Sequence, residues 1–179
     1  MWRALGVLLV GGLLAGACGD DGDAGSGNDA VAVAQRLAER LDQEAIEVDE
    51  VFVPLLETMD DPPGVAWFIE LCSGLDPIRQ ATYEEFASLD APDGLSSWDA
   101  YIEAKRVRVE TGQATCQGLQ DDPAEAEAAV ADGVPIFSFI EPVTRPVEDA
   151  EFAACLDLQA EVGAITDLVL NCDGIPPGQ

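Results

Sequence analysis

Residues 31–59, VAVAQRLAERLDQEAIEVDEVFVPLLETM, carry the strongest structural signal in the chain. Apolar or small residues recur along this segment at steps that alternate between three and four, which places them on one face of a helix. They are Val31, Ala34, Ala38, Leu41, Ala45, Val48, Phe52, Leu55 and Met59. Asn28 or Asp29 can cap the helix, and Pro54 predicts a kink or a new start because proline lacks a backbone donor. A coiled-coil dimer would use the same stripe, but alanine offers little apolar area, so we expect packing within a monomer.

Further helices are predicted downstream of this segment. A helical stretch begins at Val65, and Asp76-Pro77 is typical of a cap followed by proline at the first position of a new helix. Later helices are expected from residue 95 or 97 to about residue 119, over residues 124–131 with Gly133 closing the helix, and over residues 148–171. Few segments show the period-two alternation of strands, so the sequence predicts an all-α fold, a single helical bundle.

Residues 134–147, VPIFSFIEPVTRPV, differ from their surroundings. Three prolines are expected to exclude a long helix there. The apolar side chains of Phe137, Phe139 and Ile140 lie close together in this segment. They predict either a plug that closes the bundle or an exposed contact patch, and the plug is the default because monomers rarely leave such a patch in water.

Composition excludes several classes of function. The 179 residues contain 35 acids, 8 bases and no histidine, which gives a formal net charge of −27. A surface this negative repels phosphate backbones, so we expect no nucleic-acid partner. Histidine-based metal sites and catalytic triads are impossible, and the cysteines lack the C-x-x-C spacing of metal sites, so no metal or cofactor is predicted. The acidic surface would suit a small cationic ligand.

Residues 1–17, MWRALGVLLVGGLLAGA, have the pattern of a signal peptide, with an uncharged stretch that is too short to span a bilayer comfortably. Residues 14–18, LAGAC, resemble the lipobox of bacterial lipoproteins. This resemblance implies that the signal is cut before Cys18 and that Cys18 carries the lipid (two or three acyl chains, palmitate among the acids expected), which would anchor the protein to the outer face of the cell membrane. Ala15-Gly16-Ala17 also fits ordinary secretory cleavage, which would release the protein.

The chain after the signal divides into a tether and one domain. Residues 18–28 comprise the lipidated cysteine and a segment rich in Gly, Asp, Ser and Asn, which cannot bury enough apolar surface to order itself. Residues 29–179 are long enough for a single α-helical domain with its own core.

The number of cysteines supports the anchor. An odd count of five leaves one thiol to explain in an exported protein, and lipid on Cys18 leaves four for two disulfides. A continuous last helix would hold Cys155 and Cys172 roughly 25 Å apart, too far for a bond unless Gly163 breaks that helix. We therefore expect Cys116–Cys155 and Cys72–Cys172, with Cys72–Cys155 and Cys116–Cys172 as the open alternative.

A wider resemblance covers about residues 72–172. Residues 86–101, FASLDAPDGLSSWDAY, are similar to the step "helix, Leu-x-Ala-Pro, helix" of small secreted helical lipoproteins of high-GC bacteria. The group implies no general activity. The single lysine against seven arginines agrees with high-GC coding.

Two classes of function follow. The first is a non-catalytic, membrane-anchored binding or interaction module of the cell envelope, a monomer whose partner is an envelope protein or a small cationic ligand. Its contact surface would be the Phe137–Ile140 stretch or a groove between helices. The alternative is a hydrolase that uses carboxylates only, and Glu70 beside Trp67 is the first acid to consider because burial there would mark a site. Trp67, Trp98, Tyr83 and Tyr101 could stack on a ligand, although core packing is the more ordinary role for each.

Overall fold

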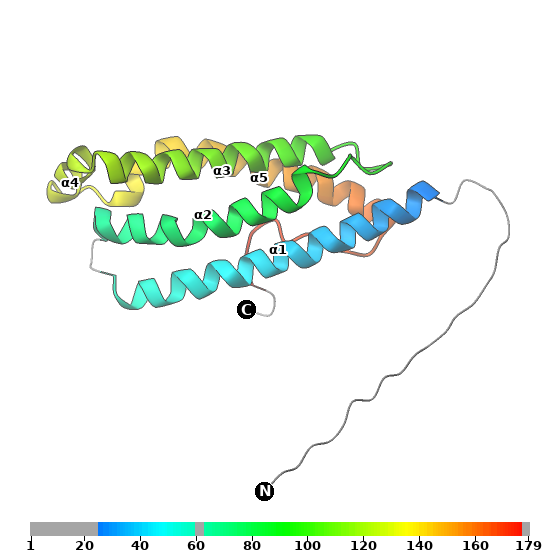
Figure 1. Ribbon diagram of the computed structural model, residues 1–179, viewed down its shortest axis with the longest axis horizontal. Helices are drawn as coiled ribbons and strands as arrows, with labels where there is room; N and C mark the ends of the chain where they lie inside the picture. The colour runs from blue at the N-terminus through cyan, green and yellow to red at the C-terminus, as the bar shows by residue number, and fades with distance from the viewer. Residues whose placement is uncertain (1–24, 60–62, 177–179) are drawn as a thin grey trace, which may run out of the picture.

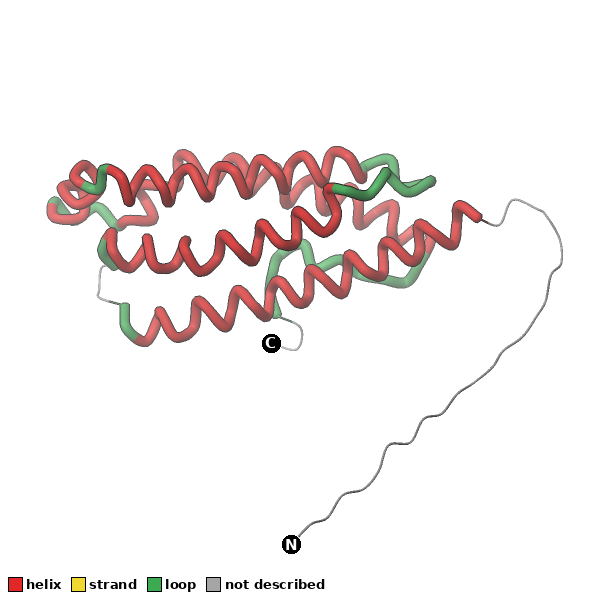
Figure 2. The backbone as a smooth tube through the Cα atoms, viewed as in Figure 1, coloured by secondary structure: helices red, strands yellow, loops and turns green. Residues whose placement is uncertain are grey.

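The structure is a computed structural model that describes residues 25–59 and 63–176. This part of the chain contains helices and no strand (Figures 1 and 2). The helices are α1 (Gly25–Glu57), α2 (Val65–Ala87), α3 (Trp98–Asp121), α4 (Ala124–Ala131) and α5 (Ile136–Ile165). The four long helices lie along the molecule, and α4 closes one end between α3 and α5 (Figure 1). The predicted all-α bundle is confirmed. The predicted signal peptide and Cys18 lie outside the described residues.

Packing of the long helices follows the chain order. α3 contacts both α2 and α5, and α1 packs on α2. α1 begins at Gly25, before the expected caps, and continues through Pro54 to Glu57 without a new start. α4 has the predicted bounds, and Gly133, with a φ of 86°, ends it in the left-handed conformation that glycine tolerates best.

The expected break at Asp76-Pro77 is wrong, because α2 is one helix from Val65 to Ala87 with Pro77 inside it. The buried side of α2 lies on both sides of Pro77, with Phe68 and Leu75 before it and Thr82 and Phe86 after it. Pro77 itself is exposed, so its ring lies on the opposite side. Burial of the apolar side along the whole helix offsets the backbone hydrogen bond that proline removes.

The expectation of a non-helical segment over residues 134–147 is also wrong. α5 starts at Ile136 and contains both Pro142 and Pro146. These prolines are four residues apart and both are exposed, as is Ser138, one turn before Pro142. The carbonyls that lose their helical donors therefore face solvent, where water can satisfy them.

The last helix ends earlier than predicted, and this changes the disulfides. α5 stops at Ile165 instead of residue 171, and Thr166 is extended with φ −146° and ψ 170°. The chain then runs back along α5: the side chain of Gln159 accepts a hydrogen bond from the Leu170 backbone and donates one to the Leu168 carbonyl at 3.2 Å. We call residues 166–176 the return segment.

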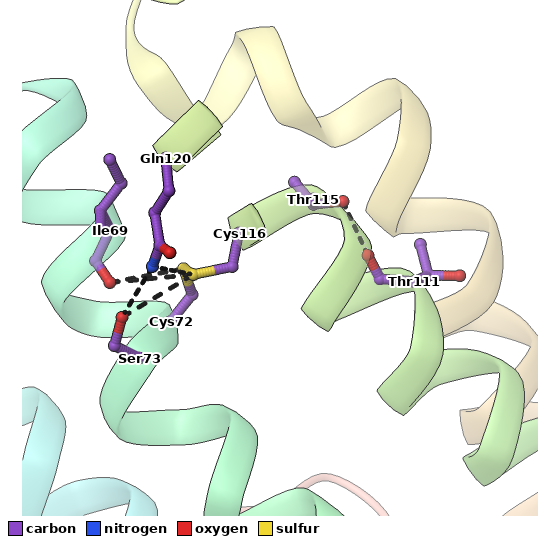
Figure 3. Close-up of a disulfide and its surroundings, with 7 residues drawn as sticks. All are labelled: Ile69, Cys72, Ser73, Thr111, Thr115, Cys116 and Gln120. Atoms are coloured by element: carbon purple, nitrogen blue, oxygen red, sulfur yellow. Dashed lines mark hydrogen bonds between the residues drawn. A yellow bond between two sulfur atoms is a disulfide. The ribbon is translucent and has the colours of Figure 1, made fainter. Parts of the chain in front are cut away.

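The disulfides join Cys72 to Cys116 and Cys155 to Cys172, so both the expected pairing and its open alternative are wrong. The return segment brings the α-carbon of Cys172 to 5.7 Å from that of Cys155, which a continuous helix would have prevented. The other bond joins neighbouring antiparallel helices, α2 and α3, and Gln120 donates a hydrogen bond to Ser73 beside it (Figure 3).

The core consists of two apolar clusters at opposite ends of the bundle. One is built around Leu37, Trp98, Tyr101 and Leu158, and the other around Phe68, Leu71, Leu119, Ile136 and Ile140. All four long helices contribute to both clusters. Between the clusters, each of these helices places charged residues at the same height.

Candidate functional site

The candidate site is this charged layer across the middle of the bundle. α1 contributes Glu44, α2 contributes Asp76 and Arg79, α3 contributes Lys105 and Arg108, and α5 contributes Glu148 and Glu151. On each of the four long helices the layer separates residues of one apolar cluster from residues of the other. The layer is therefore a common feature of the whole bundle.

Lys105 lies at the centre of the layer and is 3% exposed. Its Nζ atom is 3.0 Å from Glu44 Oε2 and 3.1 Å from Glu151 Oε1, so it joins α1, α3 and α5. Burial alone would lower the pKa of Lys105, but the surrounding oxygens of Tyr101, Glu44 and Glu151 outweigh burial and raise it. Burial also raises the pKa of the enclosed Tyr101 well above its ordinary value. Lys105 is therefore held charged and Tyr101 neutral.

The neighbouring residues extend the layer toward α2. Arg108, also buried, has its Nη2 atom 2.7 Å from Glu148 Oε1. Burial raises the pKa of Asp76, and the guanidinium groups of Arg79 and Arg108 oppose that rise. A Cβ atom at Gly112 would lie 3.3 Å from Asp76 Oδ1 and 3.5 Å from Arg108 Nη1. The absence of a side chain at Gly112 leaves room for these polar groups against α3.

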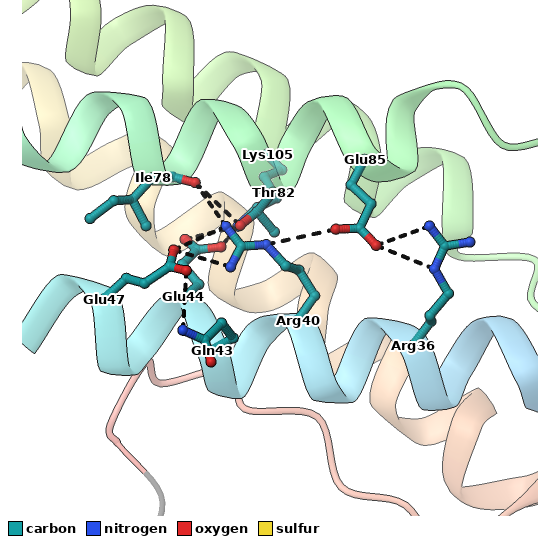
Figure 4. A network of polar contacts seen from close by, with 9 residues as sticks. All are labelled: Arg36, Arg40, Gln43, Glu44, Glu47, Ile78, Thr82, Glu85 and Lys105. Carbon is teal, nitrogen blue, oxygen red and sulfur yellow. Dashed lines mark hydrogen bonds and ion pairs between the residues drawn. The ribbon is translucent and has the colours of Figure 1, made fainter. Parts of the chain in front are cut away.

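A second set of ion pairs lies next to the layer, between α1 and α2 (Figure 4). Arg40 contacts Glu47 at 3.1 Å and donates to the Ile78 carbonyl, and Arg36 contacts Glu85 at 3.0 Å. Thr82 is fully buried and donates to the same carbonyl. These contacts fix α1 against α2 next to Lys105.

Two cavities are lined by several residues of the layer each. The polar cavity has a volume of about 520 Å³ and lies among the four long helices and the return segment, with Arg79 as the contribution of α2. The apolar cavity has a volume of about 370 Å³ and lies among α2, α3 and α5. The two share Arg79, Arg108, Arg145 and Glu148 in their walls. Both volumes are within the range typical of small-molecule sites, roughly 300–1,000 Å³.

The distribution of positive charge is the unusual property of this site. The whole chain has 8 basic residues, and four of them (Arg79, Lys105, Arg108 and Arg145) line the polar cavity. A protein that keeps its few bases for solubility would place them on its surface. Here half of them border one space between helices.

The side chains predicted as a contact patch are only partly brought together. Phe137 is 42% exposed and lines the apolar cavity, with its ring 5.9 Å from that of Trp67 and 6.0 Å from that of Phe68. Ile140 lines the same cavity but is buried, as the plug interpretation expected. Phe139 is half-buried and lies in the wall of a different pocket.

The other predicted residues do not form a site. Glu70 is exposed and lines neither cavity, so it is not the enclosed acid that the hydrolase hypothesis required. Trp67 donates from its ring nitrogen to the Leu55 carbonyl at 2.8 Å, which ties α2 to α1. Trp98 is packed into the core, and Tyr101 is packed there at the edge of the polar cavity. Tyr83 is half-buried.

Sequence reasoning missed the basic residues of the layer. On α3 the inner positions are Trp98, Ile102, Val109, Cys116 and Leu119, and six residues separate Ile102 from Val109, as six separate Val109 from Cys116. Lys105, the one lysine of the chain, fills the first of these gaps at helical spacing. A lone charged residue on an apolar stripe was therefore the signal.

None of the described helices is both long and apolar enough to cross a membrane. Over residues 25–59 and 63–176, no group of three or more metal-ligating side chains is arranged to hold a metal ion. Comparisons with protein-family models, with curated proteins and with solved structures find no match to this chain.

Proposed function

We propose that this protein is a lipid-anchored binding protein on the outer face of a bacterial cell membrane, and that it holds a small ligand in the two cavities beside the charged layer. The single observation that carries the proposal is the gathering of four of the 8 bases on one interhelical cavity. Replacing a buried ion pair with well-packed apolar residues often leaves the stability of a protein unchanged or raises it. A charged layer that borders open space is therefore better explained by a ligand than by the stability of the fold.

The anchor is supported by the cysteines. The two disulfides use Cys72, Cys116, Cys155 and Cys172, so none of the other four cysteines is left to pair with Cys18. Acylation of Cys18 gives this remaining thiol a role, and two or three acyl chains hold a protein durably where one chain holds only weakly. The mature domain would then lie close to the membrane surface.

A small cationic ligand is the second candidate for the polar cavity. Five carboxylates line it: Glu44, Glu148, Asp149, Glu151 and Asp173. The net charge of −27 would attract a cation from a distance. Most of these carboxylates are already occupied by Lys105, Arg108 and Arg145, so the cavity offers less to a cation than their number implies.

The anchor is tested by replacing Cys18 with Ser. The native protein should sediment with membranes and have the mass of a chain that starts at Cys18 with a diacylglyceryl group. That mass should rise by about four hydrogens when the two disulfides are reduced. C18S should appear in the soluble extracytoplasmic fraction. A C18S variant that still sediments fully with membranes would contradict the anchor.

The cavity is tested independently of the ligand's identity. Thr144 lines the apolar cavity and is only half-buried, so T144F should fill the cavity without overpacking the core. Small molecules extracted from the envelope of the producing cells should raise the Tm of the wild-type protein more than that of T144F. The matched control is V143F, because Val143 is adjacent, 56% exposed and outside both cavity walls. Equal shifts in all three proteins would exclude the apolar cavity as the binding site.

A further inference from the structure

Arg79 differs from every other base in the described part of the chain. Arg36, Arg40, Lys105, Arg106, Arg108 and Arg145 each have a carboxylate within ion-pair distance. Arg79 makes no direct hydrogen bond or ion pair with another residue of that part. Its guanidinium group has five N–H donors in a planar arrangement that matches a carboxylate.

The position of Arg79 makes an unused guanidinium costly. It is half-buried in the wall shared by the two cavities, and Arg108 is close enough to repel it. Burial and Arg108 lower the pKa of Arg79, while Glu44, Glu151 and Asp76 act in the opposite direction from beyond contact distance. An arginine stays charged in proteins, so an anion bound in the cavity beside Arg79 would offset the free-energy cost of burying its charge.

The other half of the apolar cavity has a different character. Phe68, Leu71, Leu75, Phe137 and Ile140 form its apolar wall on α2 and α5. Arg79 lies on α2 one helical turn beyond Leu75, so the apolar wall leads directly to the guanidinium. A ligand that fits both parts has an anionic group at one end and a short apolar body at the other.

The neighbouring acids limit the charge of that ligand to about one. Asp76, Glu141 and Glu148 also line the apolar cavity, and they equal the number of its arginines. A dianion such as phosphate would place its second charge near carboxylates with no further free base to compensate it. A monocarboxylate would use the one guanidinium that is free.

We propose, on the basis of the proposed function, that the ligand is a small amphiphilic monocarboxylate. Its carboxylate pairs with Arg79, and its apolar body lies along Phe68, Leu71 and Leu75. The pair is a bidentate arginine–carboxylate contact, which carries orientation as well as affinity.

Three probes of the same shape test this inference: 4-phenylbutyrate, 4-phenylbutylamine and 4-phenylbutanol. They are soluble, so binding can be measured by calorimetry on the full lipoprotein in nanodiscs, with empty nanodiscs subtracted. The carboxylate should bind about tenfold or more tightly than the amine and the alcohol, which corresponds to one charge-assisted contact. T144F should weaken binding of the carboxylate, and V143F should not.

The role of Arg79 is tested with substitutions at the same site. R79Q should weaken binding of 4-phenylbutyrate by about tenfold and leave binding of the alcohol unchanged, and R79K should restore part of the loss because it keeps the charge without the planar fork. R106Q is the control, since Arg106 is an exposed arginine paired with Glu103 and Glu110. Thermal melting identifies any variant that fails to fold, and R79K then serves alone.

Each outcome separates the inference from the proposed function. If the amine binds as tightly as the carboxylate, or if R79Q has no effect, the monocarboxylate is overturned. If T144F still weakens binding of the probes in that case, the cavity remains supported as the binding site. Absence of binding by all three probes also overturns the monocarboxylate, and the envelope-extract experiment then decides the proposed function separately.

Discussion

Lys105 shows at the scale of one residue why the charged layer is tightly constrained. It is the single lysine of the chain, and its ammonium group holds together two carboxylates from different helices. Because the pKa of Lys105 is raised in the folded state, the stability from these pairs is fully present below the ordinary lysine pKa of about 10.4 and is lost only in more alkaline solution.

Replacing Lys105 with Met should lower the free energy of unfolding by about 3 kcal/mol, because it leaves Glu44 and Glu151 enclosed without a counterion. The measurement is urea unfolding at neutral pH. R106M, at an exposed pair on the same helix, should leave stability almost unchanged, because exposed ion pairs are screened by solvent. Adding E44Q and E151Q to K105M should recover part of the loss. No recovery would mean that the loss comes from packing.

Glu161 illustrates a cap supplied by another helix. It lies on α5 and accepts hydrogen bonds from the Ser97 backbone at 2.9 Å and from the hydroxyls of Ser96 and Ser97, at the start of α3. These donors, the Ser96 hydroxyl first, lower the pKa of Glu161. A lowered pKa means that the contact stabilises the fold above the ordinary glutamate pKa and is lost as the pH falls through the folded value.

E161Q should therefore lower the free energy of unfolding by about 1 kcal/mol at pH 7, which is typical of a lost helix cap, and by almost nothing at about pH 3. The measurement is the difference in unfolding free energy between the wild type and E161Q across that range. D157N, at an exposed acid one turn earlier on the same helix, should show no such pH-dependent difference. A difference that stays constant with pH would exclude ionised Glu161 as the cap.

At the scale of elements, most of the helices could be predicted from apolar spacing. The stripe of α1 and the bounds of α4 follow from positions along the sequence alone. The errors arose at prolines, where the local preference of proline to end a helix was outweighed by the packing of the whole helix. Pro77, Pro142 and Pro146 each lie inside a helix because their rings point to solvent, and sequence alone does not show which side of a helix faces out.

The candidate site was less predictable than the helices. Phe137 and Ile140 were found through their apolar clustering, and both line the apolar cavity. Arg79 and Arg108 were missed because ordinary solvated bases have the same sequence signature. These arginines line a cavity only because charged residues of the other long helices lie at the same level of the bundle, and the sequence does not show how the helices are aligned.

The return segment depends on the disulfide that holds it. Removing Cys155–Cys172 with C155S and C172S should cost about 3 kcal/mol, and removing Cys72–Cys116 about 4 kcal/mol, because the longer loop is restricted more in the unfolded chain. Hydrogen exchange separates the two variants. The amide of Leu168 donates to the Thr166 hydroxyl, and that of Leu170 donates to Gln159. Both amides should exchange faster only in the first variant, since only Gln159, the Asn171–Asp42 hydrogen bond and the buried Leu170 would then hold the segment. Equal protection in both variants would show that the hydrogen bonds of Gln159 and Asn171 and the burial of Leu170 hold the segment without the disulfide.

At the scale of the whole molecule, the exposed acids carry most of the net charge of −27, and the buried bases do not relieve it. Lys105 and Arg108 are buried, so they neutralise interior carboxylates and do little for the outer ones. Self-repulsion of the exposed acids should oppose the compact state. Screening that repulsion with salt should stabilise the protein.

The Tm should therefore rise with NaCl, steeply between about 0.01 M and 0.2 M and then level off, because the Debye length falls from about 30 Å to below 10 Å over that range. Calorimetry over a series of salt concentrations measures this. A general salting-out effect would instead keep rising with concentration. K105M should have a lower Tm but the same salt dependence, since its missing charge lies in the interior, where salt screens poorly. A wild-type Tm that falls with salt would mean that the surface ion pairs, such as Arg106 with Glu110, outweigh the repulsion.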